Sequence, residues 1–282
     1  ITFTSGANGT ITLASVLPDL TNNGTLTITG NGAANTIISG NNAYRVFVVA
    51  SSATVNLNAL TVTHGLAPTA RGGGIYNSGT LAIDSSVISS NNGGDFGGGI
   101  YSTVSTSLTM TNSTISGNSA ASGAGIYSIG TLSVANSTIS GNTVIPSPTG
   151  SSDPVIGNGG GIIVQGTGVI RESVFSGNTA LEDGGGVLVT QSANATIINS
   201  TFSGNTAAKG SGVAGGVSSY SGFTCSVTVI NSTINGNSTG VTISGSGTLN
   251  LRNSIVANST GTECEQLNSS ALDAQNSLIE DG

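Results

Sequence analysis

The sequence has few of the residues on which metal sites, redox chemistry and nucleic-acid binding depend. Its 282 residues include no Trp, one His, two Cys and five Lys or Arg, against 12 Asp or Glu. The five cationic residues are scattered, at Arg45, Arg71, Arg171, Lys209 and Arg252. With a formal charge of −7, the chain offers no basic face to nucleic acid or to an anionic membrane. His64 has no His or Cys partner, and the cysteines lack Cys-x-x-Cys spacing. We therefore expect no metal, no cofactor and no nucleic-acid partner.

Helical periodicity and long apolar segments are also lacking. Short runs such as TLAID at 80–84, SLTMT at 107–111 and TLSVA at 131–135 alternate polar and apolar residues, which is typical of strands. No segment of the repeats has the 3.6-residue spacing of a helix, and no apolar run is long enough to cross a membrane. We expect an all-β protein that does not insert directly into membranes. Its 36% of hydrophobic residues argues against a disordered chain.

What the sequence has in abundance is repetition. The segment NSTISGN occurs at 112–118 and again at 136–142, and close copies follow it. A glycine-rich marker, GGGIY at 72–76 and 97–101, recurs in phase with these segments as far as AGGVS at 214–218. Two markers that repeat together, with a period mostly in the twenties, indicate one structural unit stacked many times.

Each repeat holds about three short strands separated by Gly, Asn and Ser corners. Because no helix is available to connect parallel strands, the chain has to coil. The sequence therefore predicts a single right-handed parallel β-helix, a solenoid of about ten coils. It predicts one domain over 1–282, with lead-in coils at 1–66, regular coils at 67–260 and a terminal coil at 261–282. The segment 144–158 is an insertion expected to project from one corner without disturbing the stack.

Two sets of side chains are expected to stack from coil to coil. The Asn that closes each repeat is expected to form a structural ladder at a corner, comprising Asn91, Asn118, Asn142, Asn178, Asn205 and Asn237. Tyr76, Tyr101 and Tyr127 occupy one position in three consecutive repeats and are expected to form a stripe. The favoured interpretation is a stabilising cross-coil ladder, and the alternative is a glycan-contacting stripe.

The two cysteines leave two alternatives open. An even count in an exported protein favours a disulfide between Cys225 and Cys264. The register opposes it, because Cys225 falls opposite Gly247, whereas Cys264 belongs to a later corner. A disulfide needs Cα atoms within about 7 Å.

The motifs resemble two groups of β-helix proteins. The pairing of GGGI, as at 97–100, with FSGN, as at 202–205, resembles the Gly-Gly-Ala-Ile and Phe-x-x-Asn repeats of chlamydial polymorphic outer-membrane proteins. The pattern from ITFTSGANGTITL at 1–13 to NSIVANSTGTEC at 253–264 is more similar to secreted bacterial right-handed β-helix repeat proteins that carry a Cys-Ser-Leu-Arg-Glu-Ala segment, which does not occur here. This resemblance implies an extracellular or cell-surface, adhesin-like protein, and it supplies no catalytic residues.

An enzyme is the alternative, because parallel β-helices host polysaccharide hydrolases and lyases. A hydrolase needs closely placed carboxylates, and a lyase needs a carboxylate cluster for Ca²⁺ beside a Lys or Arg base. Asp19, Asp84, Asp95 and Asp153 are isolated in the sequence, so no catalytic constellation is evident. We expect a non-catalytic structural or adhesin-like module, with a carbohydrate-binding or polysaccharide-degrading β-helix as the alternative.

The ends of the chain suggest a further partner. Residues 1–13 begin in a strand pattern, the last strand-like residues are SLI at 277–279, and neither end carries an obvious cap. Since uncapped strand edges pair with other edges, we expect copies to stack end to end into a filament, unless flanking sequence supplies caps. The expected partners are therefore the protein itself, or glycans and proteins of a cell surface.

Overall fold

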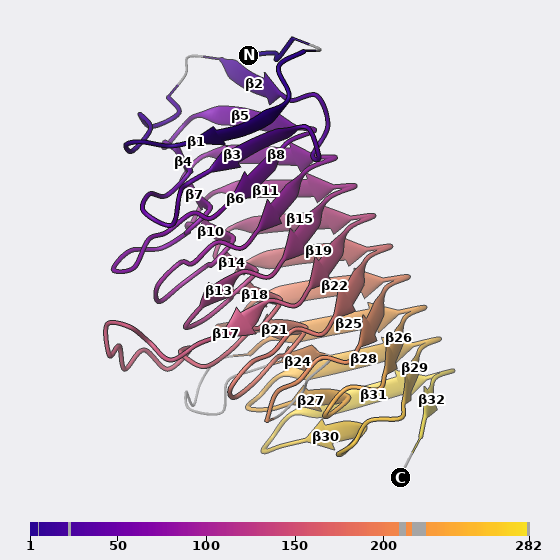
Figure 1. The fold of residues 1–282 in the computed structure, drawn as a ribbon. Coiled ribbons are helices and arrows are strands. Elements are labelled where there is room, and N and C mark those ends of the chain that lie inside the picture. The colour runs from indigo at the N-terminus through magenta and orange to yellow at the C-terminus, as the bar shows by residue number, and fades with distance from the viewer. Residues whose placement is uncertain (5, 22–23, 209–212, 216–223, 281–282) are drawn as a thin grey trace.

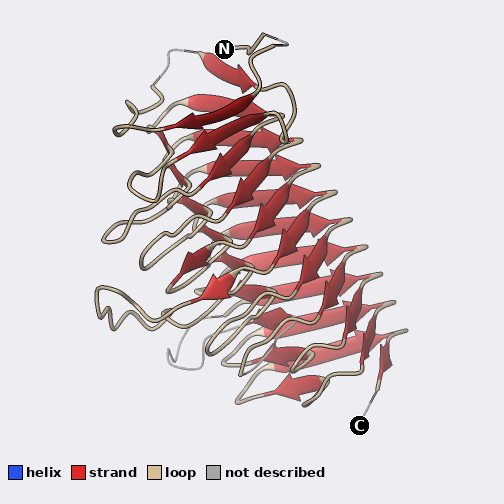
Figure 2. Cartoon of the chain, in the orientation of Figure 1, coloured by secondary structure: helices blue, strands red, loops and turns tan. Residues whose placement is uncertain are grey.

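The chain folds as a parallel β-solenoid of about ten turns, as the computed structural model shows (Figures 1 and 2). The structure describes residues 1–4, 6–21, 24–208, 213–215 and 224–280, and these residues include no helix. The all-β class and the parallel stacking expected from the sequence are confirmed. Lys209 and most of the glycine marker at 214–218 lie outside the described residues.

Each complete turn contributes one strand to each of three parallel sheets, here called A, B and C. Sheet A contains β2 (Thr25–Thr29), β5 (Thr54–Asn58), β8 (Thr80–Asp84), β11 (Ser107–Thr111), β15 (Thr131–Ala135), β19 (Thr167–Arg171), β22 (Asn194–Ile198), β25 (Ser226–Ile230), β28 (Thr248–Arg252) and β31 (Ala271–Gln275). Sheet B contains β1 (Gly9–Thr12), β3 (Thr36–Ser39), β6 (Thr61–Thr63), β9 (Val87–Ser89), β12 (Thr114–Ser116), β16 (Thr138–Ser140), β20 (Val174–Ser176), β23 (Thr201–Ser203), β26 (Thr233–Asn235), β29 (Ile255–Ala257) and β32 (Leu278–Ile279). Sheet C contains β4 (Phe47–Val49), β7 (Ile75–Asn77), β10 (Ile100–Ser102), β14 (Ile126–Ser128), β18 (Ile162–Val164), β21 (Val187–Val189), β24 (Val213–Gly215), β27 (Val241–Ile243) and β30 (Cys264–Gln266). A small fourth sheet pairs β13 (Ser119–Ala120) with β17 (Thr143–Val144).

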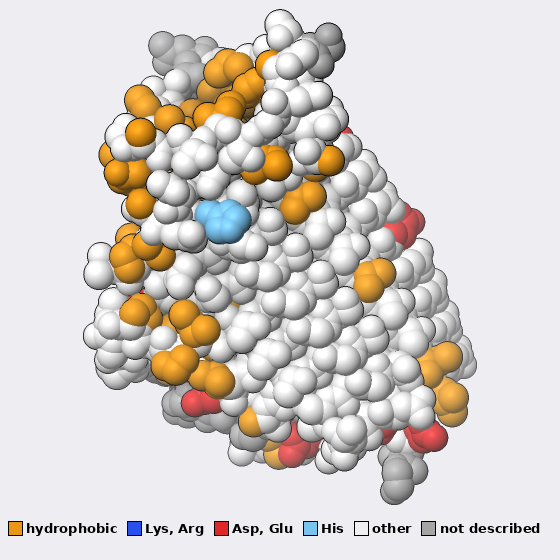
Figure 3. Space-filling view, viewed as in Figure 1, with side chains coloured by type: hydrophobic (Ala, Val, Ile, Leu, Met, Phe, Trp, Pro, Cys, Tyr) orange, Lys and Arg blue, Asp and Glu red, His pale blue; other side chains and the backbone are white. Residues whose placement is uncertain are grey.

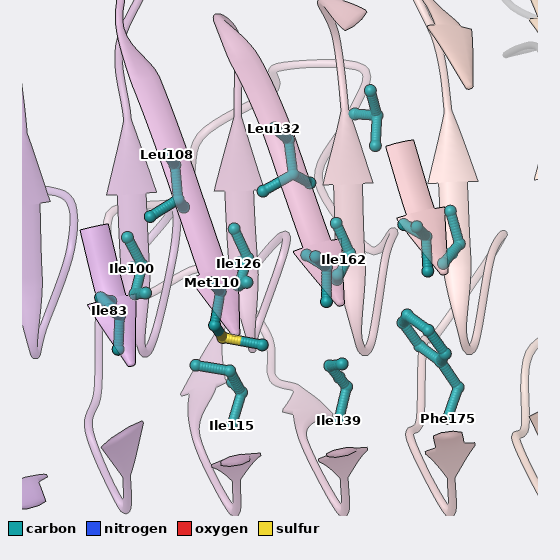
Figure 4. Close-up of a cluster of buried hydrophobic side chains, with 14 of the residues drawn as sticks. Ile83, Ile100, Leu108, Met110, Ile115, Ile126, Leu132, Ile139, Ile162 and Phe175 are labelled. Carbon is teal, nitrogen blue, oxygen red and sulfur yellow. The ribbon is translucent and has the colours of Figure 1, made fainter. Parts of the chain in front are cut away.

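The core runs along the axis of the solenoid as columns of apolar side chains (Figure 4). Strand alternation points every second residue inward, so β11 buries Leu108 and Met110 while its other residues face outward. In sheet B the inward residue is the central one, and Ile115 of β12 pairs in register with its equivalents in β9 and β16. These side chains are completely buried. Each coil therefore buries its apolar face only through its two neighbours.

The asparagines that close the repeats lie in one buried column after sheet B. Asn142 shows the pattern: its Nδ2 donates to Oδ1 of Asn178 at 2.9 Å and to the carbonyl of Ile115 at 3.1 Å. Its own Oδ1 accepts from the backbone N–H of Asn118 at 3.1 Å and from Asn118 Nδ2 at 2.9 Å. Equivalent side-chain bonds connect the whole series from Asn91 to Asn237. The amides thereby bond both to the neighbouring coil and to the corner backbone.

The glycine marker is explained by close contact between coils. At Gly125, a Cβ atom would lie 2.4 Å from the backbone oxygen of Gly161 in the next coil. Such a distance is too short for any side chain, so the residue must be glycine. Small residues at this corner allow backbone to stack on backbone, which brings the residues before sheet C into register.

Residues 1–4 and 6–20 form most of a first turn. Thr2 bridges to Thr29 at the edge of sheet A, β1 pairs with β3 in sheet B, and Leu20 bridges to Val49 in sheet C. All four residues of β1 are exposed. At the other end, β32 closes sheet B. Within the described residues, no helix is long and apolar enough to cross a membrane.

Candidate functional site

The three repeat tyrosines stack on the outer side of sheet C. Tyr76, Tyr101 and Tyr127 are Cα partners in β7, β10 and β14. Their ring centroids are 5.6 Å apart for the first pair and 5.3 Å for the second, with interplanar angles of 16° and 26°. Phe96 packs edge-on against Tyr127 at 5.2 Å. The register of a parallel sheet therefore brings residues 25 or 26 positions apart into one aromatic column.

The insertion at 144–158 covers most of this column. Its Val155 is 1% exposed and packs in the same cluster as Tyr101 and Tyr127, which are 2% and 4% exposed. The insertion leaves the stack undisturbed, since β14 and β18 pair in register on either side of it, but it also packs over the tyrosine column, which the sequence did not predict. The glycan-contacting interpretation fails for Tyr101 and Tyr127 because their rings are buried. Burial also raises the pKa of both phenols above the ordinary value, since the charged form would lose its hydration.

Tyr76 is the half-buried end of the column, but both faces of its ring are occupied. Tyr101 stacks on it from the following coil, and the guanidinium of Arg45 lies 5.3 Å from its centroid from the preceding coil. A sugar ring that stacks on an aromatic side chain needs an open ring face. The stripe therefore has the geometry of a cross-coil ladder that ends in a cation–π contact.

A cleft of about 860 Å³ opens where the insertion stops covering the column. Its walls come from the first coil, from the corners before sheet C and from the insertion. The lining residues are Asp19, Arg45, Val48, Thr69, Ala70, Arg71, Tyr76, Asp95, Phe96, Thr149, Ser151 and Asp153. Five of them are charged, in a chain with only five cationic and 12 acidic residues. By contrast, charged side chains are sparse on the face shown in Figure 3, where the single histidine is exposed.

Two arginines are held in the cleft without an ion pair. Arg45 donates from Nε to the carbonyl of Gly72 at 2.9 Å and from Nη2 to the carbonyl of Arg71 at 2.8 Å. Arg71 lies 5.0 Å from the ring centroids of both Phe96 and Tyr101 and donates from Nη1 to the Tyr101 hydroxyl at 2.7 Å. Partial burial lowers the pKa of Arg45. Among the described residues, the ion pair is made elsewhere, between Arg252 and Asp273.

Three carboxylates reach the cleft from distant parts of the chain. Asp95 accepts hydrogen bonds from the hydroxyls of Ser147, at 2.6 Å, and Thr149, and these bonds fix the insertion to a coil 52 residues earlier. Asp153 accepts from the backbone N–H of Val155 through Oδ1 at 3.1 Å. Asp19 contributes from the first coil. The three residues, which are isolated in the sequence, thus share one cleft. No group of three or more His, Cys, Asp or Glu in the described part of the chain could hold a metal ion.

The cysteines do not form a disulfide with each other. Cys225 is buried just before β25 and contacts the position of Gly247 in the next coil, whereas Cys264 begins β30 in sheet C, opposite Val241. The two residues therefore belong to different sides of the solenoid, in agreement with the register. Burial raises the pKa of the Cys225 thiol to about 11, because the thiolate would be poorly hydrated.

The spacing of charged residues along the sequence contained a signal for the cleft. Arg71 follows Arg45 by 26 residues, and Asp19 precedes Arg45 by the same interval. One coil has about this length, so charged residues at such intervals lie on neighbouring coils near one corner. Asp19 and Arg45 are not exact register partners, because Leu20 pairs with Val49. The contribution of the insertion has no comparable signal, because its length is not periodic.

The chain matches no protein-family model, and searches of curated proteins and of solved structures found no similar protein. The fold is therefore established as a parallel β-solenoid by its sheet topology. Its relation to particular secreted β-helix repeats stays a prediction from the motifs, and function has to be argued from the cleft.

Proposed function

We propose that the chain is a non-catalytic, adhesin-like β-helix module of the extracellular space or the cell surface, and that its cleft is the binding site. The observation that carries this proposal is the convergence of two guanidinium groups and three carboxylates in one cleft of about 860 Å³. Volumes of about 300–1,000 Å³ are typical of small-ligand sites. The repeat motifs, which resemble those of secreted β-helix proteins, support the extracellular assignment.

The architecture suits a binding module. The site residues lie on stacked coils whose backbones are hydrogen-bonded in register, and the insertion is fixed by bonds to Asp95. Polar groups on such a scaffold need little ordering when a ligand binds, which favours affinity. A non-catalytic role is supported by the state of Asp95, whose two carboxylate oxygens already accept hydroxyl hydrogen bonds.

Binding of the purified chain to intact cells and to extracellular matrix tests this proposal. We expect saturable binding that decreases in the Asp153→Asn variant and is retained in the Glu172→Gln variant, because Glu172 is an exposed residue at the corner between sheets A and B. Binding that is equally retained in both variants would show that the cleft is not the site. The absence of any binding would contradict the adhesin-like role.

A polysaccharide-degrading enzyme is the second candidate, because Asp19, Asp95 and Asp153 share the cleft. Hydrolysis and elimination are tested by assays for reducing sugars and for unsaturated products on neutral and acidic polysaccharides. Turnover that is lost on replacing one of these aspartates by Asn would overturn the non-catalytic proposal. No turnover together with retained binding would support it.

We further propose that copies stack end to end through the terminal coils. Ile11 of β1 is 45% exposed although its register partner Ile38 is buried, and Ile279 of β32 is only half-buried although its partner Val256 is completely buried, so inward apolar side chains and strand edges are open at both ends of sheet B. A second copy, or further coils of a longer chain, can pair there. Light scattering and negative-stain microscopy of residues 1–282 test for filaments. A monomer whose mass does not depend on concentration would refute self-assembly.

A further inference from the structure

The cleft presents open hydrogen-bonding groups of both signs. A guanidinium has five N–H donors, and Arg71 uses Nη1 for Tyr101. Asp153 is exposed and accepts its hydrogen bond from Val155 through Oδ1. Asp19 is exposed as well, and it lies close enough to influence Arg45 electrostatically, although no ion pair joins them. Arg45 and Arg71 come from the second and third coils, between Asp19 of the first coil and Asp153 of the insertion, so a ligand meets N–H donors flanked by carboxylate acceptors.

The charges of these groups nearly cancel. Two guanidiniums and three carboxylates sum to a charge of −1. Because two hydroxyl donors of the insertion occupy the oxygens of Asp95, the groups left to hydrogen-bond a ligand are two guanidiniums and two carboxylates. Such a site has little preference for a net charge. The formal charge of −7 on the whole chain opposes polyanions, and Arg45 and Arg71 oppose a polycation. Charge complementarity thus favours a ligand without net charge.

The apolar part of the cleft does not offer a stacking platform. Both faces of the Tyr76 ring are covered, and Phe96 is 7% exposed, with its ring engaged by Tyr127 and Arg71. The hydroxyl-bearing Thr69 and Ser151 extend the polar lining. Recognition in this cleft therefore depends on hydrogen bonds and not on ring stacking.

We infer that the cleft binds a neutral saccharide, whose adjacent hydroxyls accept hydrogen bonds from Arg71 and donate them to Asp19 and Asp153. A hydroxyl is both donor and acceptor, whereas a guanidinium only donates and a carboxylate only accepts. Neighbouring hydroxyls on one ring can therefore satisfy both groups without adding charge. This inference rests on the proposed binding function of the cleft and names its ligand class.

Isothermal titration calorimetry with three groups of ligands tests the inference. The groups are neutral oligosaccharides from glucan, xylan, galactan and mannan, acidic oligogalacturonates, and zwitterionic dipeptides. We expect at least one neutral oligosaccharide to bind, and its affinity to fall about tenfold or more in Asp19→Asn, Asp153→Asn and Arg71→Gln, since each loses a hydrogen bond to a charged group. The control variants Arg171→Gln and Glu172→Gln should bind within about twofold of the parent.

The possible outcomes separate this inference from the proposed function. Binding of oligogalacturonates or dipeptides alone, or neutral binding unchanged in all three cleft variants, overturns the saccharide assignment. Cell binding that is lost in Asp153→Asn, while no neutral oligosaccharide binds, also overturns it but leaves the adhesin-like role intact. Saccharide binding that requires the cleft, without cell or matrix binding, supports the inference and contradicts the adhesin-like role.

Discussion

Replacing Asn142 by Ala tests whether the buried asparagine column stabilises the solenoid. Asn142 is 0% exposed and connects three coils. Its Oδ1 accepts from the backbone N–H and from Nδ2 of Asn118. Ala keeps the backbone but removes this acceptor, as well as the donor that reaches Asn178. The column is thereby interrupted in the middle of the stack.

The magnitude follows from the groups left without a partner. Two N–H bonds of Asn118 lose their acceptor, and each unsatisfied buried donor costs about 1–3 kcal/mol, so the loss is about 2–6 kcal/mol. This is a large fraction of the ~5–15 kcal/mol by which folded domains are usually stable. Asn118 Nδ2 keeps its other bond, to the carbonyl of Ile88 at 3.0 Å, which limits the damage to one corner.

Urea unfolding followed by far-ultraviolet circular dichroism measures the difference. The matched control is Asn194→Ala, because Asn194 is the exposed first residue of β22 and its side chain makes no hydrogen bond within the described residues. We expect the control to change the free energy of unfolding by less than about 0.5 kcal/mol. If the two variants differ by less than about 1 kcal/mol, the buried amides contribute little and the reasoning is wrong.

Three further changes test the packing of the coils. Ile139→Asp places an unpaired charge at a fully buried position and should cost about 3–5 kcal/mol or divide the solenoid, whereas Ser140→Asp on the outward side should cost less than about 1 kcal/mol; equal losses in urea unfolding would reverse the assigned register. Gly125→Ala should destabilise the protein more than Gly141→Ala, because the new methyl group at position 125 clashes with the backbone of the next coil. At position 141 the methyl group meets no atom, and the cost is only that of the positive φ of 60°, about 1 kcal/mol. The reverse order of stabilities would exclude tight contact between coils at Gly125. Because burial raises the pKa of Tyr127 in the folded protein, the contribution of this phenol to stability is fully present below its unfolded pKa of about 10 and is lost as the pH rises through the folded pKa. The Tyr127→Phe variant should therefore lose less stability at high pH in urea unfolding. An identical pH profile in both proteins would contradict burial of the phenol.

The repeat architecture could be read from the sequence because its determinants are local. Alternation in runs such as 107–111 specifies which residues point inward, and the repeated spacing of the markers specifies how coils align. The structure stacks Ile115 on its equivalents with this same register. In a solenoid each coil contacts only its neighbours, so local pattern and tertiary contact carry nearly the same information.

The cleft could not be read in the same way. The path of the insertion at 144–158 depends on hydrogen bonds from Ser147 and Thr149 to Asp95 and on burial of Val155 over the tyrosine column. These contacts cross more than one coil, and no periodic pattern encodes them. Sequence alone therefore determined the strands, their inward faces and the stacking of equivalent residues. Tertiary structure decided that the tyrosines are covered and that separate carboxylates share a cleft with two arginines, because a non-repetitive loop is positioned by its contacts and not by its spacing.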